Sequence, residues 1–145
     1  MTELGLHAAQ AILSAALAKA RDLKLKPVAI VVLDARGAVK CSAAEDATSL
    51  KRMDVAHGKA NGALALGLGS RTLFKRAKEQ PFFLAAVGPI VGGLVPVPGG
   101  VLIRDASGSV CGAVGISGDT SDNDETTAVT SIVAAGFVAD PGSES

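Results

Sequence analysis

Apolar residues recur at helical spacing in two long stretches of the chain. In residues 3–24 they place Leu6, Leu13, Leu17 and Ala20 on one face, with Ala9 and Ala16 beside it. His7 falls on the polar stripe of this helix, so we expect it to be exposed. In residues 46–68 the apolar stripe consists of Leu50, Met53, His57, Ala60, Leu64 and Leu68. His57 interrupts this stripe, so we expect it to face the interior or a pocket.

Shorter apolar runs between turn signals predict strands. Residues 28–33 (VAIVVL) form a continuous run, typical of a strand buried on both faces, and residues 34–37 (DARG) predict a hairpin turn leading into a strand over 39–43. Further strands are predicted over 82–87, 101–103 and 110–117, listed in chain order. We expect a long loop over 88–97, because this segment is broken by prolines and glycines.

The chain ends in one more predicted helix, over 123–138, with Val129, Ile132, Val133 and Gly136 inward and a frayed tail from Asp140. This order of elements predicts a single α+β domain over 1–145. Its expected core is a five-stranded, mainly antiparallel sheet flanked by long helices. Because the chain has no Trp, no Tyr and only four Phe, that core must consist of Ala, Val, Leu and Ile.

Charge and cysteine content exclude some classes of protein. The 14 basic and 14 acidic residues balance without a block of either sign, which disfavours nucleic-acid binding. No apolar run reaches the roughly 18 residues of a membrane span, and the start lacks a basic secretory n-region. Two cysteines in such a chain indicate reduced thiols, so we expect a cytoplasmic protein in which Cys41 is a small buried hydrophobe.

Two glycine segments near the last helix carry the candidate binding chemistry. Backbone amides of residues 98–100 (PGG), and of the loop from Gly115 to Ser121 before the helix, can accept a carboxylate. The alternative is a tight turn and an ordinary helix cap, in which Ser121 and Asp124 form a capping box and Asp124 accepts a cap hydrogen bond. We assign ligand binding to Pro98, Gly99, Gly100, Gly118, Asp124, Glu125 and Arg52.

His57 is the candidate catalytic residue. Its imidazole either faces a ligand or is a core histidine satisfied by a carbonyl or by Asn61 one turn on. Lys59 projects from another face of the same helix, where charges are usually solvated. The cysteine and histidine spacing contains no zinc motif, and we assign no metal-ligating residue.

Two C-terminal segments, PGGVLI and GAVGISGDTSDNDETTA, resemble the GlcG/HbpS family, whose domain also forms the C-terminus of PduO-type cobalamin adenosyltransferases. PVAIVVLDARG resembles the first hairpin of this family and DVAHGKANGALALG its central helix. The resemblance covers nearly the whole chain. It implies a profilin-like fold, haem or a related tetrapyrrole as a possible cofactor or ligand, and a homo-oligomer.

The resulting hypothesis is a small-molecule-binding protein without a nucleic-acid or membrane partner. The resemblance to the GlcG/HbpS family also suggests the alternative, an enzyme of small organic-acid or aromatic catabolism. In that case His57 acts as general acid or base and the glycine loops hold a carboxylate or oxyanion. A third possibility is an interaction module without a ligand. The nearly unrelieved apolar segment 81–98 independently favours self-association, because an exposed patch of this size is rare in monomers.

Overall fold

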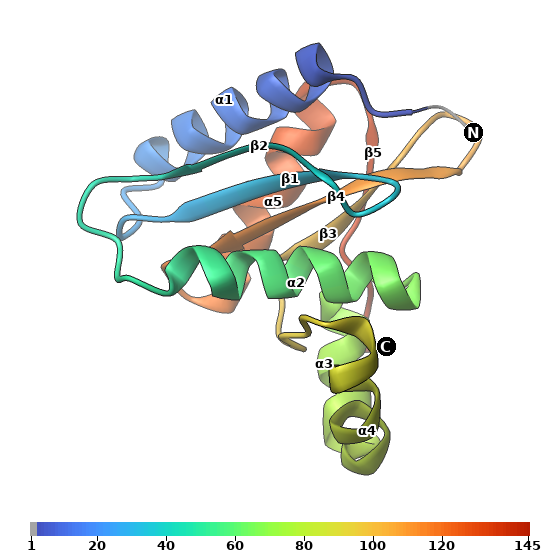
Figure 1. Ribbon diagram of the computed structural model, residues 1–145. Coiled ribbons are helices and arrows are strands. Elements are labelled where there is room, and N and C mark those ends of the chain that lie inside the picture. The colour runs from blue at the N-terminus through green and yellow to red at the C-terminus, as the bar shows by residue number, and fades with distance from the viewer. Residues whose placement is uncertain (1–2) are drawn as a thin grey trace.

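The structure, a computed structural model, describes residues 3–145 and contains one five-stranded sheet with the strand order β2-β1-β4-β3-β5 (Figure 1). Each neighbouring pair is antiparallel, so the expected α+β architecture is confirmed. The elements in chain order are α1 (Leu6–Asp22), β1 (Ala29–Asp34), β2 (Val39–Ala44), α2 (Arg52–Leu66), α3 (Ser70–Glu79), α4 (Pro81–Val91), β3 (Gly100–Arg104), β4 (Val110–Ser117), α5 (Ser121–Ala134) and β5 (Val138–Asp140).

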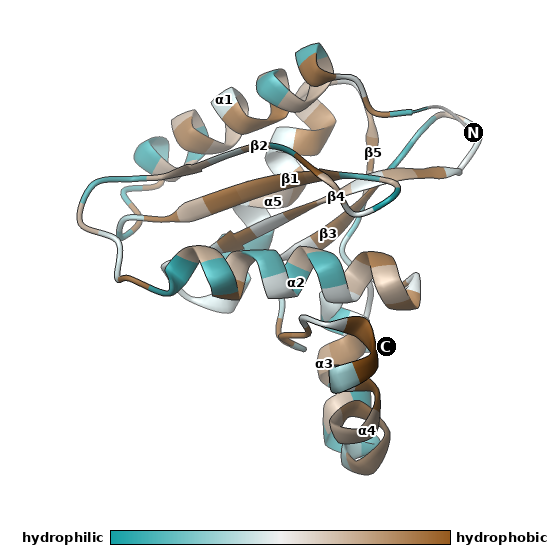
Figure 2. Ribbon diagram, viewed as in Figure 1, coloured by the Kyte–Doolittle hydropathy of each residue, from teal (hydrophilic) through white to brown (hydrophobic). Residues whose placement is uncertain are grey.

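β1 lies inside the sheet and is buried along its whole length, as its continuous apolar run predicts. Its side chains alternate between two cores. Ile30 and Val32 point to the layer formed by α1 and α5, whereas Val31 and Leu33 point to α2 on the opposite face. Figure 2 shows the apolar residues that run along β1 between these two helical layers. The turn after β1 is also as predicted, since Gly37 has a φ of +85°.

In α1 and α2 the buried residues differ in part from the predicted apolar faces. In α1 the buried residues are Ala9, Ile12, Ala16 and Ala20. The expected Leu6 is 51% exposed, because small side chains let α1 lie close to the sheet along the alanine stripe. α2 begins at Arg52 rather than near residue 46, and Leu50 is 90% exposed outside it.

The segment after α3 is a helix up to Val91, so the predicted strand over 82–87 is wrong. The predicted loop over 88–97 is wrong for residues 88–91 and confirmed for residues 92–97, which belong to no helix or strand. α4 begins with Pro81 at a position where a helix needs no backbone N–H, and it ends at Gly92 with a φ of +81°. Leu84 is its buried residue, and α4 extends away from the sheet next to α3 (Figure 1). Proline and glycine here delimit a helix instead of interrupting a strand.

The missing strand is β5, which pairs with β3. The prediction of a helix over 123–138 is wrong at its end, because Gly136, with a φ of +91°, turns the chain into this strand. Val133, predicted to face inward, is 59% exposed, whereas Ile132 is buried. Within residues 3–145 no helix combines the length and the apolar character needed to cross a membrane.

Candidate functional site

Most of the predicted ligand-binding residues lie together where β4 leads into α5. Gly118, Asp124 and Glu125 belong to this junction, and Arg52 reaches it from the start of α2 by donating a hydrogen bond from Nη1 to Ser117 Oγ at 3.1 Å. Residues 98–100 lie at the start of β3, beside the end of β4, because Ile116 N–H donates to the Gly99 carbonyl oxygen at 3.0 Å. His57 lies apart from this group.

The glycines at the start of β3 serve close packing in this structure. A Cβ atom on Gly100 would lie 2.2 Å from the Lys59 carbonyl oxygen, so only glycine lets β3 approach α2 here. The Gly100 N–H donates to Ser70 Oγ at 2.7 Å, and residues 98–100 are buried. The Gly100 amide expected to hold a ligand carboxylate is therefore already engaged within the chain.

The start of α5 is capped by its own side chains. Thr120, not the predicted Ser121, is the N-cap, and its Oγ1 accepts the Asn123 N–H at 3.2 Å. Asp124 Oδ1 accepts the Asp119 N–H at 3.1 Å, so Asp124 does take part in fixing this end of the helix. Asp119 accepts a hydrogen bond from the Asn123 side chain, and this bond, with those from the N–H groups of Lys26 and Thr120, lowers the pKa of Asp119 to about 2.

A buried ion pair joins α2 to α5 beneath this loop. Lys59 Nζ lies 3.2 Å from Asp124 Oδ2 and also donates to the Ile116 carbonyl oxygen at 2.9 Å. The side chains are 3% and 1% exposed, so the expectation that Lys59 is solvated is wrong. Burial lowers the pKa of Lys59 and raises that of Asp124, while the charge of each partner opposes the shift of the other.

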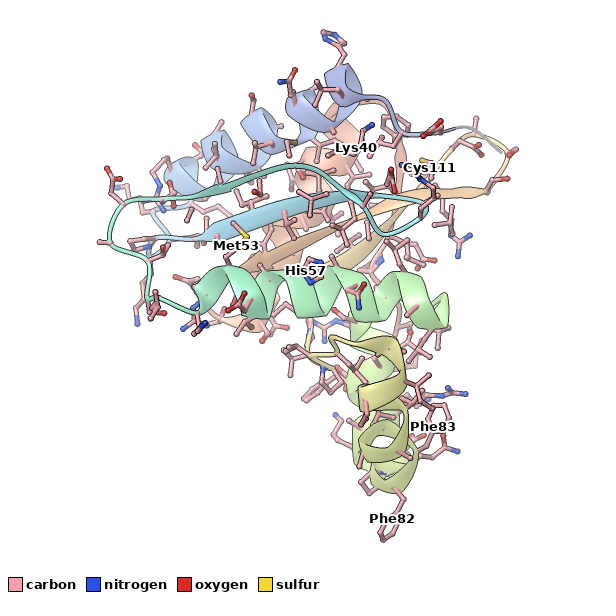
Figure 3. All side chains as sticks on the ribbon, viewed as in Figure 1. Lys40, Met53, His57, Phe82, Phe83 and Cys111 are labelled. Carbon is pink, nitrogen blue, oxygen red and sulfur yellow. The ribbon has the colours of Figure 1, made fainter. Side chains whose placement is uncertain are left out.

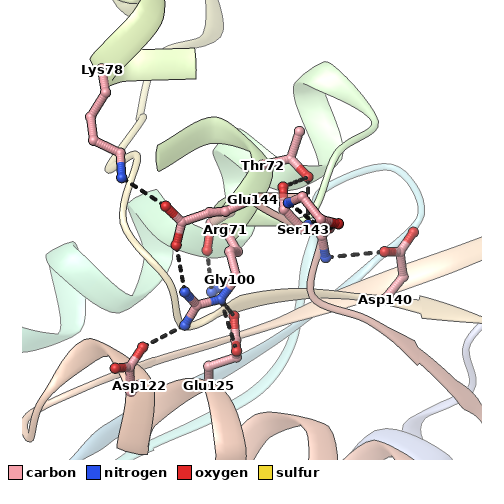
Figure 4. Close-up of polar contacts among 12 residues, drawn as sticks. Arg71, Thr72, Lys78, Gly100, Asp122, Glu125, Asp140, Ser143 and Glu144 are labelled. Carbon is pink, nitrogen blue, oxygen red and sulfur yellow. Dashed lines mark hydrogen bonds and ion pairs between the residues drawn. The ribbon is translucent and has the colours of Figure 1, made fainter. Parts of the chain in front are cut away.

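Arg71 organises a second, more exposed charge cluster (Figure 4). Its Nε donates to Glu125 at 2.9 Å, its Nη1 to Glu144 at 2.7 Å, and its Nη2 to Asp122. These carboxylates raise the pKa of the Arg71 guanidinium. The predicted ligand residue Glu125 thus has an internal partner.

Two hollows flank Thr120. One, of about 310 Å³, is lined by Lys26, Arg52, Gly118, Asp119 and Thr120. The other, of about 360 Å³, is lined by Arg71, Phe74, Lys78, Val97, Pro98, Thr120, Ser121, Asp122 and Glu144. Both place cationic groups next to the start of α5, so the junction remains a place where an anionic ligand can reach the protein. A larger hollow of about 480 Å³ lies elsewhere, between α1 and the end of β2.

His57 lies on the side of α2 that faces the hairpin of β1 and β2, together with Met53 (Figure 3). His57 is half-buried and His7 is exposed. His57 is therefore the more buried of the two, as its place on an apolar stripe and that of His7 on a polar stripe predicted. The expected partner Asn61 instead donates to the carbonyl oxygens of Val91 and Gly93 at 3.0 and 2.9 Å. No hydrogen bond within residues 3–145 engages the His57 imidazole, and no group of three or more acidic, histidine or cysteine side chains there could hold a metal ion.

Next to His57 the sheet has a surface that α2 leaves uncovered. Val39, Ser42 and Ala44 of β2 pair with Leu33, Val31 and Ala29, which all lie in the core beneath α2, so the three β2 residues share that face. All three are exposed. We call this surface, formed by Val39, Ser42, Ala44, Met53 and His57, the open face.

Lys59, Arg71 and Glu144 were missed as site residues. Lys59 stands in a run of small residues, GKANGALA, where a neighbouring backbone comes close enough to bury even a lysine. This run of small residues was the signal from which the burial of Lys59 could have been predicted. The contacts of Arg71 with Glu144 join residues far apart in the chain, and no local pattern indicates them.

Comparison with known proteins gives consistent matches. A family model described as "Haem degrading protein HbpS-like" matches residues 4–133. Among solved structures, the chain is similar to PduOC, crystallised as a complex with heme, at 25% identity and a TM-score of 0.83, over 94% of this chain and 97% of that one. It is similar to a double mutant of Streptomyces reticuli HbpS at 25% identity and a TM-score of 0.81, over 94% of this chain and 89% of that one.

Protein ORFY of Klebsiella pneumoniae shares the fold at 23% identity and a TM-score of 0.80, over 93% of this chain and 92% of that one. No curated protein sequence matches the chain significantly.

Proposed function

This chain belongs to the family of HbpS-like haem-degrading proteins, and from this premise we propose that it binds a small molecule, haem or a related tetrapyrrole. The family match over most of the chain carries the proposal, and the likeness to a protein crystallised with heme supports it. Family membership alone does not fix a ligand, so the residues of this chain must also suit one.

The open face is the surface we propose for the tetrapyrrole. Its floor consists of the small side chains Val39, Ser42 and Ala44 on an extended strand, which suits a flat apolar ring. Met53 and His57 border the floor from α2. His57 has an imidazole without an internal hydrogen bond and lies next to this floor, and an imidazole is one of the groups that hold haem iron in proteins.

In this proposal His57 would hold the haem iron through an imidazole nitrogen, and Met53 would contact the ring. Bound haem supplies an iron centre for redox and oxygen chemistry. The hollow at Arg52 lies at the start of the same helix and offers cations to carboxylates. The chain itself covers only one side of a ligand on the open face.

The enzymatic alternative, with His57 as general acid or base, has less support. A general base is normally oriented by a second group, and no carboxylate within residues 3–145 hydrogen-bonds His57. The glycine-loop amides expected to hold an oxyanion also have partners, in Ser70 for Gly100 and in Asp119 for Thr120. We therefore do not propose this activity.

Titration of the purified protein with haemin tests the proposal. We expect a Soret band that shifts and saturates at a fixed stoichiometry. His57→Ala should move the band position and weaken binding about tenfold or more, because it removes the proposed iron ligand.

His7→Ala is the matched control, since His7 is exposed on α1 and away from the open face. It should leave the titration unchanged. A wild-type protein without a saturable Soret shift would contradict haem binding. A normal titration of His57→Ala would instead contradict the place of the site.

A further inference from the structure

Glu144, in the C-terminal tail, spans two cations of α3 (Figure 4). One of its oxygens lies 2.7 Å from Arg71 Nη1 and the other 2.7 Å from Lys78 Nζ. These contacts lower the pKa of Glu144 below its ordinary value. The geometry is that of a bound carboxylate held by two charge-assisted hydrogen bonds.

The charge of Arg71 is neutralised even without the Glu144 carboxylate. Asp122 and Glu125 of α5 already face the guanidinium, so with Glu144 three carboxylates share two cations. The tail that carries Glu144 is held independently, because Arg71 N–H donates to the Pro141 carbonyl oxygen at 3.1 Å and Ser143 N–H to Thr72 Oγ1 at 2.9 Å. The Glu144 side chain is 32% exposed and can rotate away without loss of these backbone contacts.

Apolar groups stand beside the two cations. The hollow of about 360 Å³ that contains Glu144 is also lined by Phe74, Val97 and Pro98. Lys78 Nζ lies 4.3 Å from the centre of the Phe74 ring, so this ring already supports a cation. Two cations next to an aromatic ring and aliphatic side chains recognise an acid whose remaining part is apolar.

We propose that Arg71 and Lys78 form a binding site for the carboxylate of an apolar organic acid, and that Glu144 occupies this site in the absence of ligand. The incoming carboxylate takes the place of the Glu144 carboxylate, and Phe74 and Val97 contact the apolar part of the acid. The exchange moves no covalent bond and leaves the charge of the site unchanged. This proposal does not depend on haem binding, since the hollow at Arg71 and Lys78 shares no lining residue with the open face.

Calorimetric titration with benzoate tests the proposal in the full chain. Glu144→Ala removes the internal competitor, and we expect it to bind benzoate about tenfold more tightly than wild type does. Glu144→Gln keeps the size of the side chain and should give a smaller gain. Benzamide, which is similar in shape but uncharged, should not bind to either variant.

Glu79→Ala is the matched control, because Glu79 pairs with Lys75 on the same helix and lies outside the hollow. It should bind benzoate as wild type does. Adding Lys78→Met to Glu144→Ala should abolish the gain. Equal benzoate affinity of Glu144→Ala and wild type, or benzamide binding as tight as benzoate binding, would overturn the proposal.

A propionate of a tetrapyrrole carries the same carboxylate chemistry as a free acid, and a haemin titration separates the two sources. If the site serves a free acid, Lys78→Met should leave the haemin titration unchanged. A loss of haemin affinity in this variant would overturn the assignment to a free acid. Failure of the benzoate experiment would leave the His57 test of haem binding unaffected.

Discussion

The pair of Lys59 and Asp124 is the most consequential residue-scale feature of this molecule. Removing one partner of a buried pair leaves the other charge without compensation, and this typically costs about 3–5 kcal/mol. We therefore expect Asp124→Ala to lower the free energy of unfolding, measured by urea denaturation, by about 3 kcal/mol or more. A capping role alone would cost only about 1 kcal/mol.

The double variant Lys59→Met/Asp124→Leu should recover more than half of this loss, because no buried charge remains. Lys51→Met is the control, since its partner Asp54 and Lys51 itself are 70% and 78% exposed. It should cost less than about 1 kcal/mol. A similarly small effect of Asp124→Ala would show that the pair is not a buried charge pair in solution.

Asp119 makes stability depend on pH. Its pKa is about 2 in the folded chain against an ordinary 3.8, so its carboxylate stabilises the fold above pH 4. This contribution disappears as the pH falls from about 4 to about 2. Asp119→Asn should flatten the decrease in melting temperature over this interval. An unchanged slope in the variant would contradict the assignment of the effect to Asp119.

At the scale of elements, the contact of α2 with the sheet depends on glycine. A Cβ on Gly100 would lie 2.2 Å from the Lys59 carbonyl oxygen, which is backbone and cannot move aside easily. We expect Gly100→Ala to lower the free energy of unfolding by about 1–3 kcal/mol, because α2 must shift away from β3. Urea denaturation measures this loss.

Gly88→Ala serves as the comparison within a helix, since nothing lies within 4 Å of the added atom in α4. It should be neutral or stabilise by up to about 1 kcal/mol through helix propensity. If Gly100→Ala left the free energy of unfolding unchanged, α2 could move away from β3 at no cost, and the predicted dependence of this contact on glycine would be contradicted.

At the scale of the whole molecule, α4 exposes apolar side chains on several sides. Phe82 is 90% exposed, Ile90 81% and Phe83 43%. Phe82 projects from the tip of the molecule that lies farthest from the sheet, whereas Phe83 lies at the side of α4, with Arg76 Cζ 5.3 Å from the centre of its ring (Figure 3). We propose that a second copy of the chain covers α4, and we expect light scattering at micromolar concentration to give a mass well above 14.4 kDa.

Ile90→Asp should dissociate this oligomer, because it places a charge in the proposed contact. Val133→Asp introduces the same charge at another exposed apolar position, on α5, and should leave the mass unchanged. A wild-type mass near 14.4 kDa would contradict self-association. Equal dissociation by both variants would contradict the role of α4.

Local sequence patterns were sufficient for the elements that do not depend on which face packs against the core. The run over 28–33 is apolar at each position, so β1 is buried whichever face packs first, and the turn at Gly37 follows from its DARG sequence. The family motifs likewise indicated the sheet and the relatives, because they combine strands, turns and a helix start in one order. The exposure of His7 and the partial burial of His57 followed from helical periodicity alone.

Tertiary structure decided what local patterns leave open. Proline and glycine both interrupt strands and delimit helices, so α4 depends on its packing against α3 rather than on composition. The burial of Lys59 depends on Asp124, which lies 65 positions away in the chain, and the role of Glu144 depends on Arg71, 73 positions away. Charges separated in this way are paired by the fold, since helical or strand periodicity acts only over neighbouring turns.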